Sequence, residues 1–204
     1  MTIYDLKPKF QDLLRPIVLN LNNRGITPNQ VTLVAFLISI VGGGIIYSQQ
    51  LLLIAISLPI ILFVRMALNA IDGMLAREHN QMTKSGAIFN EMGDIFSDVV
   101  LFLPFMLFVS PLIVSIFIIV SISTEFIGVL GKAFYDNRVY TGPFGKSDRA
   151  FAIGVSSILL SFDIPNVIEI IFIIMIILSL KTVLNRFNEL VYHNLNILDT
   201  KGNK

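Results

Sequence analysis

Long apolar stretches separated by short polar connections dominate this sequence, and the pattern predicts membrane-spanning helices. A helix that crosses a bilayer needs about 20 mostly apolar residues. Six segments approach this pattern, near residues 29–48, 51–77, 86–109, 111–134, 149–162 and 165–190. The first begins at Thr27 and Pro28, which are typical of a helix N-cap followed by proline at the first helical position. The fifth is short, so we expect it either to begin in the preceding loop or to lie tilted.

Residues 1–26 have a different pattern, in which apolar residues recur at helical spacing between charged ones. The apolar positions are Ile3, Leu6, Phe10, Leu13, Leu14, Ile17, Val18 and Leu21. This pattern favours an amphipathic helix lying on the cytoplasmic leaflet; a helix that caps the cytoplasmic end of the protein is the alternative. The predicted fold class is an all-α integral membrane protein with six transmembrane helices plus an N-terminal amphipathic interfacial helix. We expect one domain over 1–204, with a bundle at 27–190 and a cytoplasmic tail at 191–204.

Basic residues lie on one side of these predicted connections. The connections at 48–50, 110–111 and 163–164 contain no Lys or Arg. The opposite side contains Lys7, Lys9, Arg15, Arg24, Arg77, Lys84, Lys132, Arg138, Lys146, Arg149, Lys181, Arg186, Lys201 and Lys204. The positive-inside rule therefore predicts a multi-pass protein of the inner (cytoplasmic) membrane with both termini in the cytoplasm. Lys181 and Arg186 should snorkel to that surface. Arg65 lies within an apolar run, where it either pairs with an acid or snorkels.

Composition narrows the function classes. Hydrophobic residues make up 54% of the 204 residues and charged ones 14%, which leaves too little polar surface for a soluble domain of this length. The net charge of +1 gives no indication of nucleic-acid binding. Cysteine is absent, so disulfides and thiolate metal sites are excluded.

Acidic residues gather in the cytoplasmic halves of the predicted spans, where a charge is costly and usually functional. They are Asp72, Glu91, Asp94, Asp98 and Glu125, with Asn69 and Asn90 beside them. Helical spacing places the residues at 69 and 72 on one face, and those at 90, 94 and 98 on one stripe, so they predict a single site. Carboxylates at one depth repel unless a cation neutralises them, and oxygen ligands favour one or two Mg²⁺ or Mn²⁺ ions. For Glu125 a helix-pairing contact is the simpler interpretation.

The residues from Asn69 to Asp94 resemble the signature of CDP-alcohol phosphatidyltransferases, D-x2-D-G-x2-A-R-x8-G-x3-D-x3-D. Asp72, Gly73, Ala76, Arg77, Gly86 and Asp94 match its fixed positions. The predicted spans, the interfacial helix and the basic 142–150 loop also fit this family, so the resemblance covers most of the chain. Within the family the chain is most similar to a YnbA-like bacterial branch.

The resemblance implies transfer of a phosphatidyl group from CDP-diacylglycerol, or a similar CDP-lipid, to a small polar alcohol in phospholipid biosynthesis, with release of CMP. It implies a homodimer in contact with membrane lipids, and Asp94, with Asp72, as catalytic residues. The expected metal ligands are Asn69, Asp72, Asn90, Asp94, Glu91 and Asp98. The expected CDP-lipid or phosphate contacts are Gly73, Ala76, Arg77, Gly86, Lys146 and Arg149. For Lys146 and Arg149, ordinary positive-inside charge is an equal alternative.

Two positions depart from the signature, because Asn69 and Asn90 stand where the family has aspartates. The motif then carries a formal charge of −2 instead of −4. Either Glu91 or Asp98 supplies the missing charge, or one metal is lost. An alternative function is therefore a CDP-lipid-binding member with weak or no catalysis. A small transporter is disfavoured because the outer halves of the spans are almost devoid of charge. The acceptor stays open among inositol, a sugar phosphate, glycerol phosphate and an amino alcohol.

Overall fold

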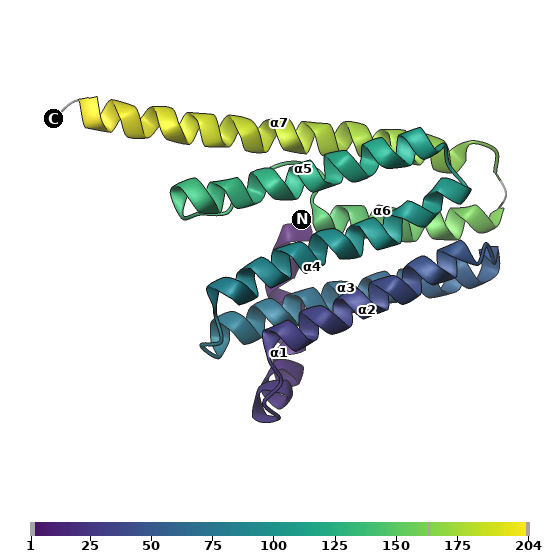
Figure 1. Cartoon of the computed structure of the whole chain (residues 1–204), viewed down its shortest axis with the longest axis horizontal. Coiled ribbons are helices and arrows are strands. Elements are labelled where there is room, and N and C mark those ends of the chain that lie inside the picture. Colours follow the sequence, from purple (N-terminus) through teal and green to yellow (C-terminus); the bar gives the residue numbers. More distant parts are fainter. Residues whose placement is uncertain (1–2, 163, 203–204) are drawn as a thin grey trace. The chain divides into compact units, whose positions relative to one another are not determined.

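The computed structural model describes residues 3–162 and 164–202, and the side chains of 8–162 and 164–192. Throughout these ranges the regular structure is helical, without a strand (Figure 1). The α-helices are α1 (Ile3–Asn23), α2 (Pro28–Tyr47), α3 (Leu51–Glu78), α4 (Lys84–Phe102), α5 (Pro111–Tyr135), α6 (Lys146–Leu159) and α7 (Val167–Gly202). Two short 3₁₀ helices are η1 (Leu103–Leu107) and η2 (Leu160–Phe162). The all-α fold class is confirmed.

Four helices of the described chain are long and apolar enough to cross a membrane: α2, α3, α5 and α7 up to Tyr192. The other two expected spans also form helices. However, α4 contains Lys84, Glu91, Asp94 and Asp98, and α6 has only 14 residues. At 1.5 Å per residue α6 is about 21 Å long, less than the bilayer core of about 30 Å. Six spans therefore stay a prediction. Of the two alternatives for the fifth segment, a start in the preceding loop is confirmed, because α6 begins at Lys146.

The chain forms two compact units, Met1–Pro104 and Phe105–Lys204, and each is described by itself. The single domain expected over 1–204 stays a prediction. The connection expected at 163–164 includes Asp163, which lies outside the described residues. Helix α7 continues to Gly202, so residues 191–202, expected as a tail, extend the last helix.

In the first unit, α2 packs against both α3 and α4. Thr27 caps α2 as the sequence predicts: its side chain accepts a hydrogen bond from the backbone of Gln30, and the Gln30 side chain accepts one from the backbone of Thr27. Small residues permit the close approach of α2 to α4. A Cβ atom added to Gly43 would lie 2.6 Å from the carbonyl oxygen of Val100. Close helix contact through small residues is typical of membrane proteins.

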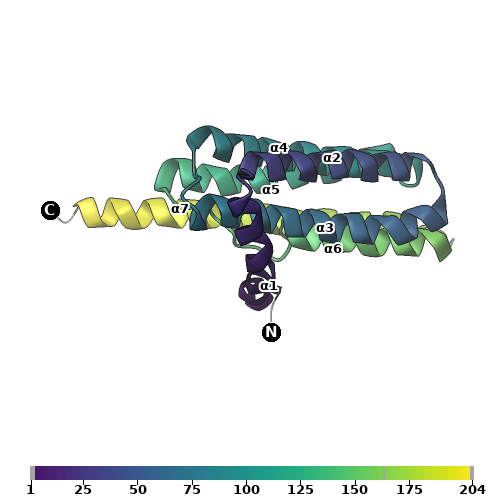
Figure 2. The same ribbon diagram turned by 90° about the horizontal axis from the view of Figure 1, so that it is seen from below.

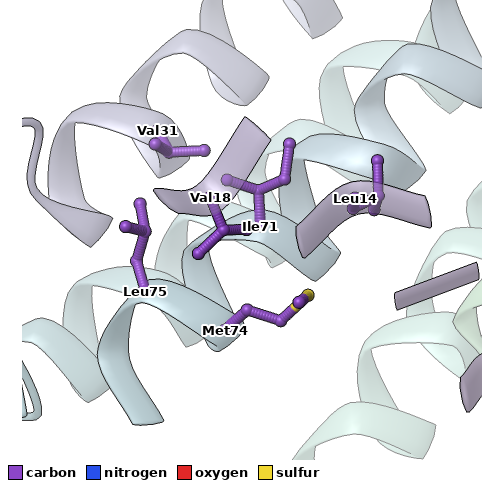
Figure 3. Packing of buried hydrophobic residues seen from close by; sticks show 6 residues of the cluster. All are labelled: Leu14, Val18, Val31, Ile71, Met74 and Leu75. Carbon is purple, nitrogen blue, oxygen red and sulfur yellow. The ribbon is translucent and has the colours of Figure 1, made fainter. Parts of the chain in front are cut away.

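Helix α1 lies across α3 rather than along it (Figures 1 and 2). Leu14 and Val18 of α1 are buried against α3 residues (Figure 3). The adjacent face of α1 leaves Leu13 72% and Ile17 49% exposed. Figure 3 shows the buried cluster, which comprises Leu14, Val18, Val31, Ile71, Met74 and Leu75. Helix α1 thus caps the end of α3, one of the two alternatives above, and still presents apolar side chains suited to a membrane interface.

In the second unit, α7 packs against α5 and α6. Phe172 of α7 lies between two aromatic rings, with centroids 5.2 Å from Phe117 and 5.4 Å from Phe105. All three rings are buried. This apolar part of the unit contrasts with the other end of α5, where charged side chains meet.

We expect Gly43→Ala to lower the melting temperature of the detergent-solubilised protein. Overpacking against Val100 should cost about 1–3 kcal/mol, more than the roughly 1 kcal/mol that Ala gains over Gly in a helix. Gly44→Ala is the matched control, because a Cβ atom there would have no atom within 4 Å. Equal melting temperatures for the two variants would contradict the close α2–α4 contact.

Candidate functional site

Asp72 is the centre of a buried hydrogen-bond network in the first unit. Its side chain lies in the last two turns of α3, and the residue is only 3% exposed. Oδ2 of Asp72 accepts a hydrogen bond of 2.9 Å from Oγ1 of Thr32 in α2 and one of 2.8 Å from Nδ2 of Asn90 in α4. The network therefore joins three helices at one carboxylate. Charge-assisted hydrogen bonds of this kind offset the cost of burying Asp72.

A second polar contact joins α3 to α4 about two turns further along. Nη2 of Arg65 lies 2.6 Å from Oδ1 of Asp98 and donates a 3.3 Å hydrogen bond to the carbonyl oxygen of Asp94. Arg65 is 3% exposed and Asp98 7%. Arg65 therefore pairs with an acid of the predicted site, and the snorkelling alternative is wrong. Because each charge neutralises the other, neither is buried alone.

The other predicted residues of the first unit lie around these contacts. Asn69, Glu91 and Asp94 are half-buried on α3 and α4. Arg77 is exposed, and its guanidinium lies over Gly73, where an added Cβ atom would be 3.1 Å from Nη2. Gly73 thus gives room to Arg77.

Two small residues shape the connection between α3 and α4. A Cβ atom on Gly86 would lie 3.1 Å from Oδ1 of Asn29, so Gly86 lets the start of α4 approach α2. The carbonyl oxygen of Ala76 accepts the backbone hydrogen bond of Gln81, which begins the loop from α3 to α4. These glycine and alanine positions serve packing in this structure, and their contact with a CDP group stays a prediction.

The second unit contains a cluster of arginines around one carboxylate, Glu125 of α5. Oε1 of Glu125 lies 2.7 Å from Nη2 of Arg149, and Oε2 lies 2.7 Å from Nη2 of Arg138. Arg149 is completely buried in α6 and also donates a 2.8 Å hydrogen bond to Oγ1 of Thr124. Glu125 therefore pairs α5 with α6, as expected for a helix-pairing contact.

Arg186 of α7 completes this cluster. It is 4% exposed and donates hydrogen bonds to the carbonyl oxygens of Thr141 and Thr124. The prediction that Arg186 snorkels is therefore wrong, because the helix packs this face against α5; Lys181 is exposed. A membrane-facing arginine and an inward-facing one cannot be told apart from sequence spacing alone.

The loop before α6 is fastened to α7. Gly142 has φ +123°, and an added Cβ atom would lie 2.5 Å from Cγ2 of Thr182. The Thr182 hydroxyl accepts a 3.0 Å hydrogen bond from the backbone of Phe144. Lys146 follows at the start of α6 and is half-buried. The small residues of this loop therefore place the basic start of α6 against α7.

The family model of CDP-alcohol phosphatidyltransferases matches residues 25–190. The chain belongs to this family. The inner membrane protein YnbA of Escherichia coli is 46% identical over 157 residues, which are 76% of this chain and 78% of YnbA. The archaetidylinositol phosphate synthase of Pyrococcus horikoshii is 36% identical over 93 residues, or 46% of this chain and 47% of that protein.

Solved structures of the phosphatidylinositol phosphate synthase PgsA1 from Mycobacterium tuberculosis share the fold. The structure with CDP-DAG bound has a TM-score of 0.69 at 20% identity, and the match covers 85% of this chain and 90% of that one. The structure in complex with manganese and citrate also has a TM-score of 0.69 at 20% identity, and covers 85% and 86%. These matches show a shared fold, and the bound CDP-DAG and manganese are described for the M. tuberculosis protein.

The residues at the signature positions offer the oxygen donors that a hard divalent cation prefers. Asp72 and Asp94 offer carboxylate oxygens, and Asn69 and Asn90 offer amide oxygens, which are the donors that Mg²⁺ and Mn²⁺ prefer. Among the residues that the structure describes, no group of three or more His, Cys, Asp or Glu side chains is placed to hold a metal ion. Asn69 and Asn90, at two of the signature positions, are not among these residue types.

Sequence reasoning missed two contributors to the polar networks of this chain. Thr32 lies in an apolar run. The sequence does not show whether its hydroxyl contacts the site or forms a hydrogen bond within its own helix. It makes both, since its Oγ1 also reaches the carbonyl oxygen of Pro28 at 3.1 Å. Arg138 was counted only as positive-inside charge. Its position in a loop gave no indication that it folds back onto Glu125.

We expect Arg65→Met to lower the free energy of unfolding by about 3–5 kcal/mol, because Asp98 would stay buried without its counter-ion. The double variant Arg65→Met with Asp98→Leu should recover most of that loss. Denaturant unfolding in detergent measures both, with Arg24→Met, at an exposed arginine of the same unit, as the control. Losses that simply add in the double variant would contradict the ion pair.

Proposed function

We propose that the protein transfers a phosphatidyl group from CDP-diacylglycerol to a phosphate-bearing alcohol and releases CMP. The observation that carries this proposal is the conjunction of the family signature with the buried network around Asp72, which assembles the signature residues of α3 and α4 with α2. The names of the P. horikoshii and M. tuberculosis relatives support it, since both describe synthases of inositol-containing lipid phosphates. The proposed setting is phospholipid biosynthesis.

The charge of the second cluster supports an acceptor that carries a phosphate. Two guanidinium groups, from Arg138 and Arg149, pair with the carboxylate of Glu125, and the guanidinium of Arg186 donates to the backbone carbonyl oxygen of the adjacent Thr124. Lys146 and Asp148 at the start of α6 add one charge of each sign, so the basic groups named here outnumber the acidic ones by two. Positive charge gathered in this way favours the binding of an anion. A phosphate supplies the charge and the acceptor oxygens that arginine forks match.

In the proposed step, Asp94 accepts the proton of the acceptor hydroxyl. The hydroxyl oxygen forms a bond to the lipid-linked phosphorus, the bridging P–O bond of the pyrophosphate breaks, and CMP leaves with that electron pair. The half-buried position of Asp94 keeps its carboxylate within reach of a substrate, and the bond from Arg65 to the backbone of Asp94 fixes this turn of α4. General base catalysis of this kind contributes about 10²–10⁴-fold.

We assign binding of the CDP-lipid to Arg77 and to the other signature residues. Arg77 presents an exposed planar cation over Gly73, suited to the pyrophosphate. Asp72 and Asp94, with Asn69 and Asn90, would hold a divalent ion, which supplies charge neutralisation for the phosphates and the leaving CMP. Glu91, half-buried on α4, is the remaining acid of this region. Asp98 is assigned to Arg65 rather than to metal.

We further propose the inner membrane as the location, with both termini in the cytoplasm. The E. coli relative is named as an inner membrane protein. The asymmetry of Lys and Arg between the connections supports the orientation. Exposed Leu13 and Ile17 of α1 would then lie in the cytoplasmic interface. This orientation gives water-borne acceptor and CMP access from the cytosol. A homodimer is expected from the family.

The purified protein should release CMP from CDP-diacylglycerol with a phosphorylated alcohol and not with the same alcohol lacking phosphate. Arg138→Gln should raise the KM for the phosphorylated acceptor about tenfold or more, because a charged hydrogen bond contributes about 1.5–3 kcal/mol. The KM for CDP-diacylglycerol should stay unchanged. Lys132→Gln, at an exposed lysine of α5, is the control. Radiolabelled CDP-diacylglycerol in detergent, with a panel of sugar, inositol and glycerol phosphates, measures this.

The same assay separates the enzyme from a CDP-lipid-binding protein. Asp94→Asn should reduce kcat by about 10²–10⁴-fold. Asp136→Asn is the matched control, because Asp136 is exposed and has φ 58°, a conformation that asparagine also adopts. Binding of CDP-diacylglycerol without CMP release from any alcohol would contradict transfer and favour the binding alternative.

Cysteine labelling tests the orientation, since the chain has no cysteine of its own. In intact cells, a membrane-impermeant maleimide should label Ser110→Cys and leave Met82→Cys unlabelled. Both positions are exposed, and they lie in connections on opposite predicted sides. After cell lysis both should react. The reverse pattern would place the α3–α4 connection outside and contradict access of CMP to the cytosol.

A further inference from the structure

We propose that this site holds one divalent ion per chain, with Asn90 acting as a hydrogen-bond donor to Asp72 in place of a second cation. The inference rests on the proposed function in one respect, that Asp72 and Asp94 are metal ligands. It concerns the number of ions, which the family signature alone leaves open here.

The orientation of the Asn90 side chain is the first observation. Its amide nitrogen, not its carbonyl oxygen, lies 2.8 Å from Oδ2 of Asp72 and 3.4 Å from Oγ1 of Thr32. The opposite orientation would place two oxygens 2.8 Å apart with no proton between them, because an ionised carboxylate has none to share. The chemistry of the contact therefore fixes the amide, whose two atoms are otherwise hard to distinguish.

Replacement of the family's aspartate at this position changes what the site requires. Two carboxylates at hydrogen-bond distance repel, and a cation between them relieves the repulsion. An asparagine donates a hydrogen bond to the same oxygen and carries no charge. Oδ2 of Asp72 also accepts the Thr32 hydroxyl at 2.9 Å. This buried oxygen is thus stabilised by two protein donors, one from α2 and one from α4.

The charges of the first unit are the second observation. Asp98 forms an ion pair with Arg65 at 2.6 Å, and both residues are buried, so the charge of Asp98 is already neutralised. Asp72 and Asp94 carry two formal negative charges at the signature positions, which one divalent ion balances. Two ions would bring four positive charges, an excess even when Glu91 is counted. Excess charge in a region of low dielectric constant is strongly unfavourable.

Arg65 therefore has a specific part in setting the number of ions. It removes the acid that could have replaced a lost aspartate, and it fixes the backbone of Asp94 through the 3.3 Å hydrogen bond to its carbonyl oxygen. Arg65 is a positioning residue for Asp94 and makes no contact with substrate in this proposal. Because Asp98 pairs with Arg65, Asp98 does not supply the negative charge that is missing at Asn69 and Asn90.

Manganese titration of the purified protein, followed by electron paramagnetic resonance, tests the count without use of activity. Loss of the signal of free Mn²⁺ should give one bound ion per chain for the wild-type protein. The double variant Asn69→Asp with Asn90→Asp should bind two, with the spectrum of two coupled ions about 3.5–4 Å apart. Asn166→Asp, at an exposed position with φ 58°, is the matched control and should bind one.

Two bound ions in the wild-type protein, or none, would overturn the count. One bound ion in the double variant would overturn the part assigned to Asn90. CMP release, measured on the same preparation, separates this result from the proposed function. One ion without CMP release would leave the count standing and contradict transfer. Two ions with CMP release would contradict the count and leave transfer standing.

Discussion

A buried carboxylate needs partners, and the Asp72 carboxylate obtains them from two other helices. Its contacts with Thr32 and Asn90 hold α2 and α4 at the signature end of α3. The Arg65–Asp98 pair makes a second connection between α3 and α4. Small residues such as Gly43 let α2 and α4 approach closely beyond these points, at Val100. The packing of the first unit and the geometry of its candidate site therefore follow from one constraint, the cost of unpaired charge among apolar helices.

In the second unit the buried charges that need partners are mainly positive. Arginines outnumber acids at the end of α5, and each is held by several contacts: Arg149 by Glu125 and Thr124, and Arg186 by two backbone carbonyl oxygens. Held cations of this kind keep their geometry when an anion arrives, which reduces the reorganisation that binding requires.

The two asparagines show how a signature can keep its fold and change its electrostatics. Asn90 lies at the spacing of a family aspartate and contacts Asp72, but it donates a hydrogen bond where an aspartate would need a cation. Membership of the family rests on the match over 25–190 and does not depend on those two positions. The number of ions does depend on them. Residues at matching positions can therefore share a place in the fold and differ in the charge that they require.

The sequence by itself determined the helical class, the helix boundaries near Pro28 and Leu51, the family and the signature residues. These follow from local periods, caps and fixed spacings, which act within one helix or one connection. Only the tertiary structure decided the partners. Arg65 and Arg186 have the same sequence signal as snorkelling residues, yet both are buried because their faces pack against other helices. Thr32, 40 residues from Asp72, could not be assigned to its network, because a contact between helices depends on their rotation and approach, which local sequence does not encode.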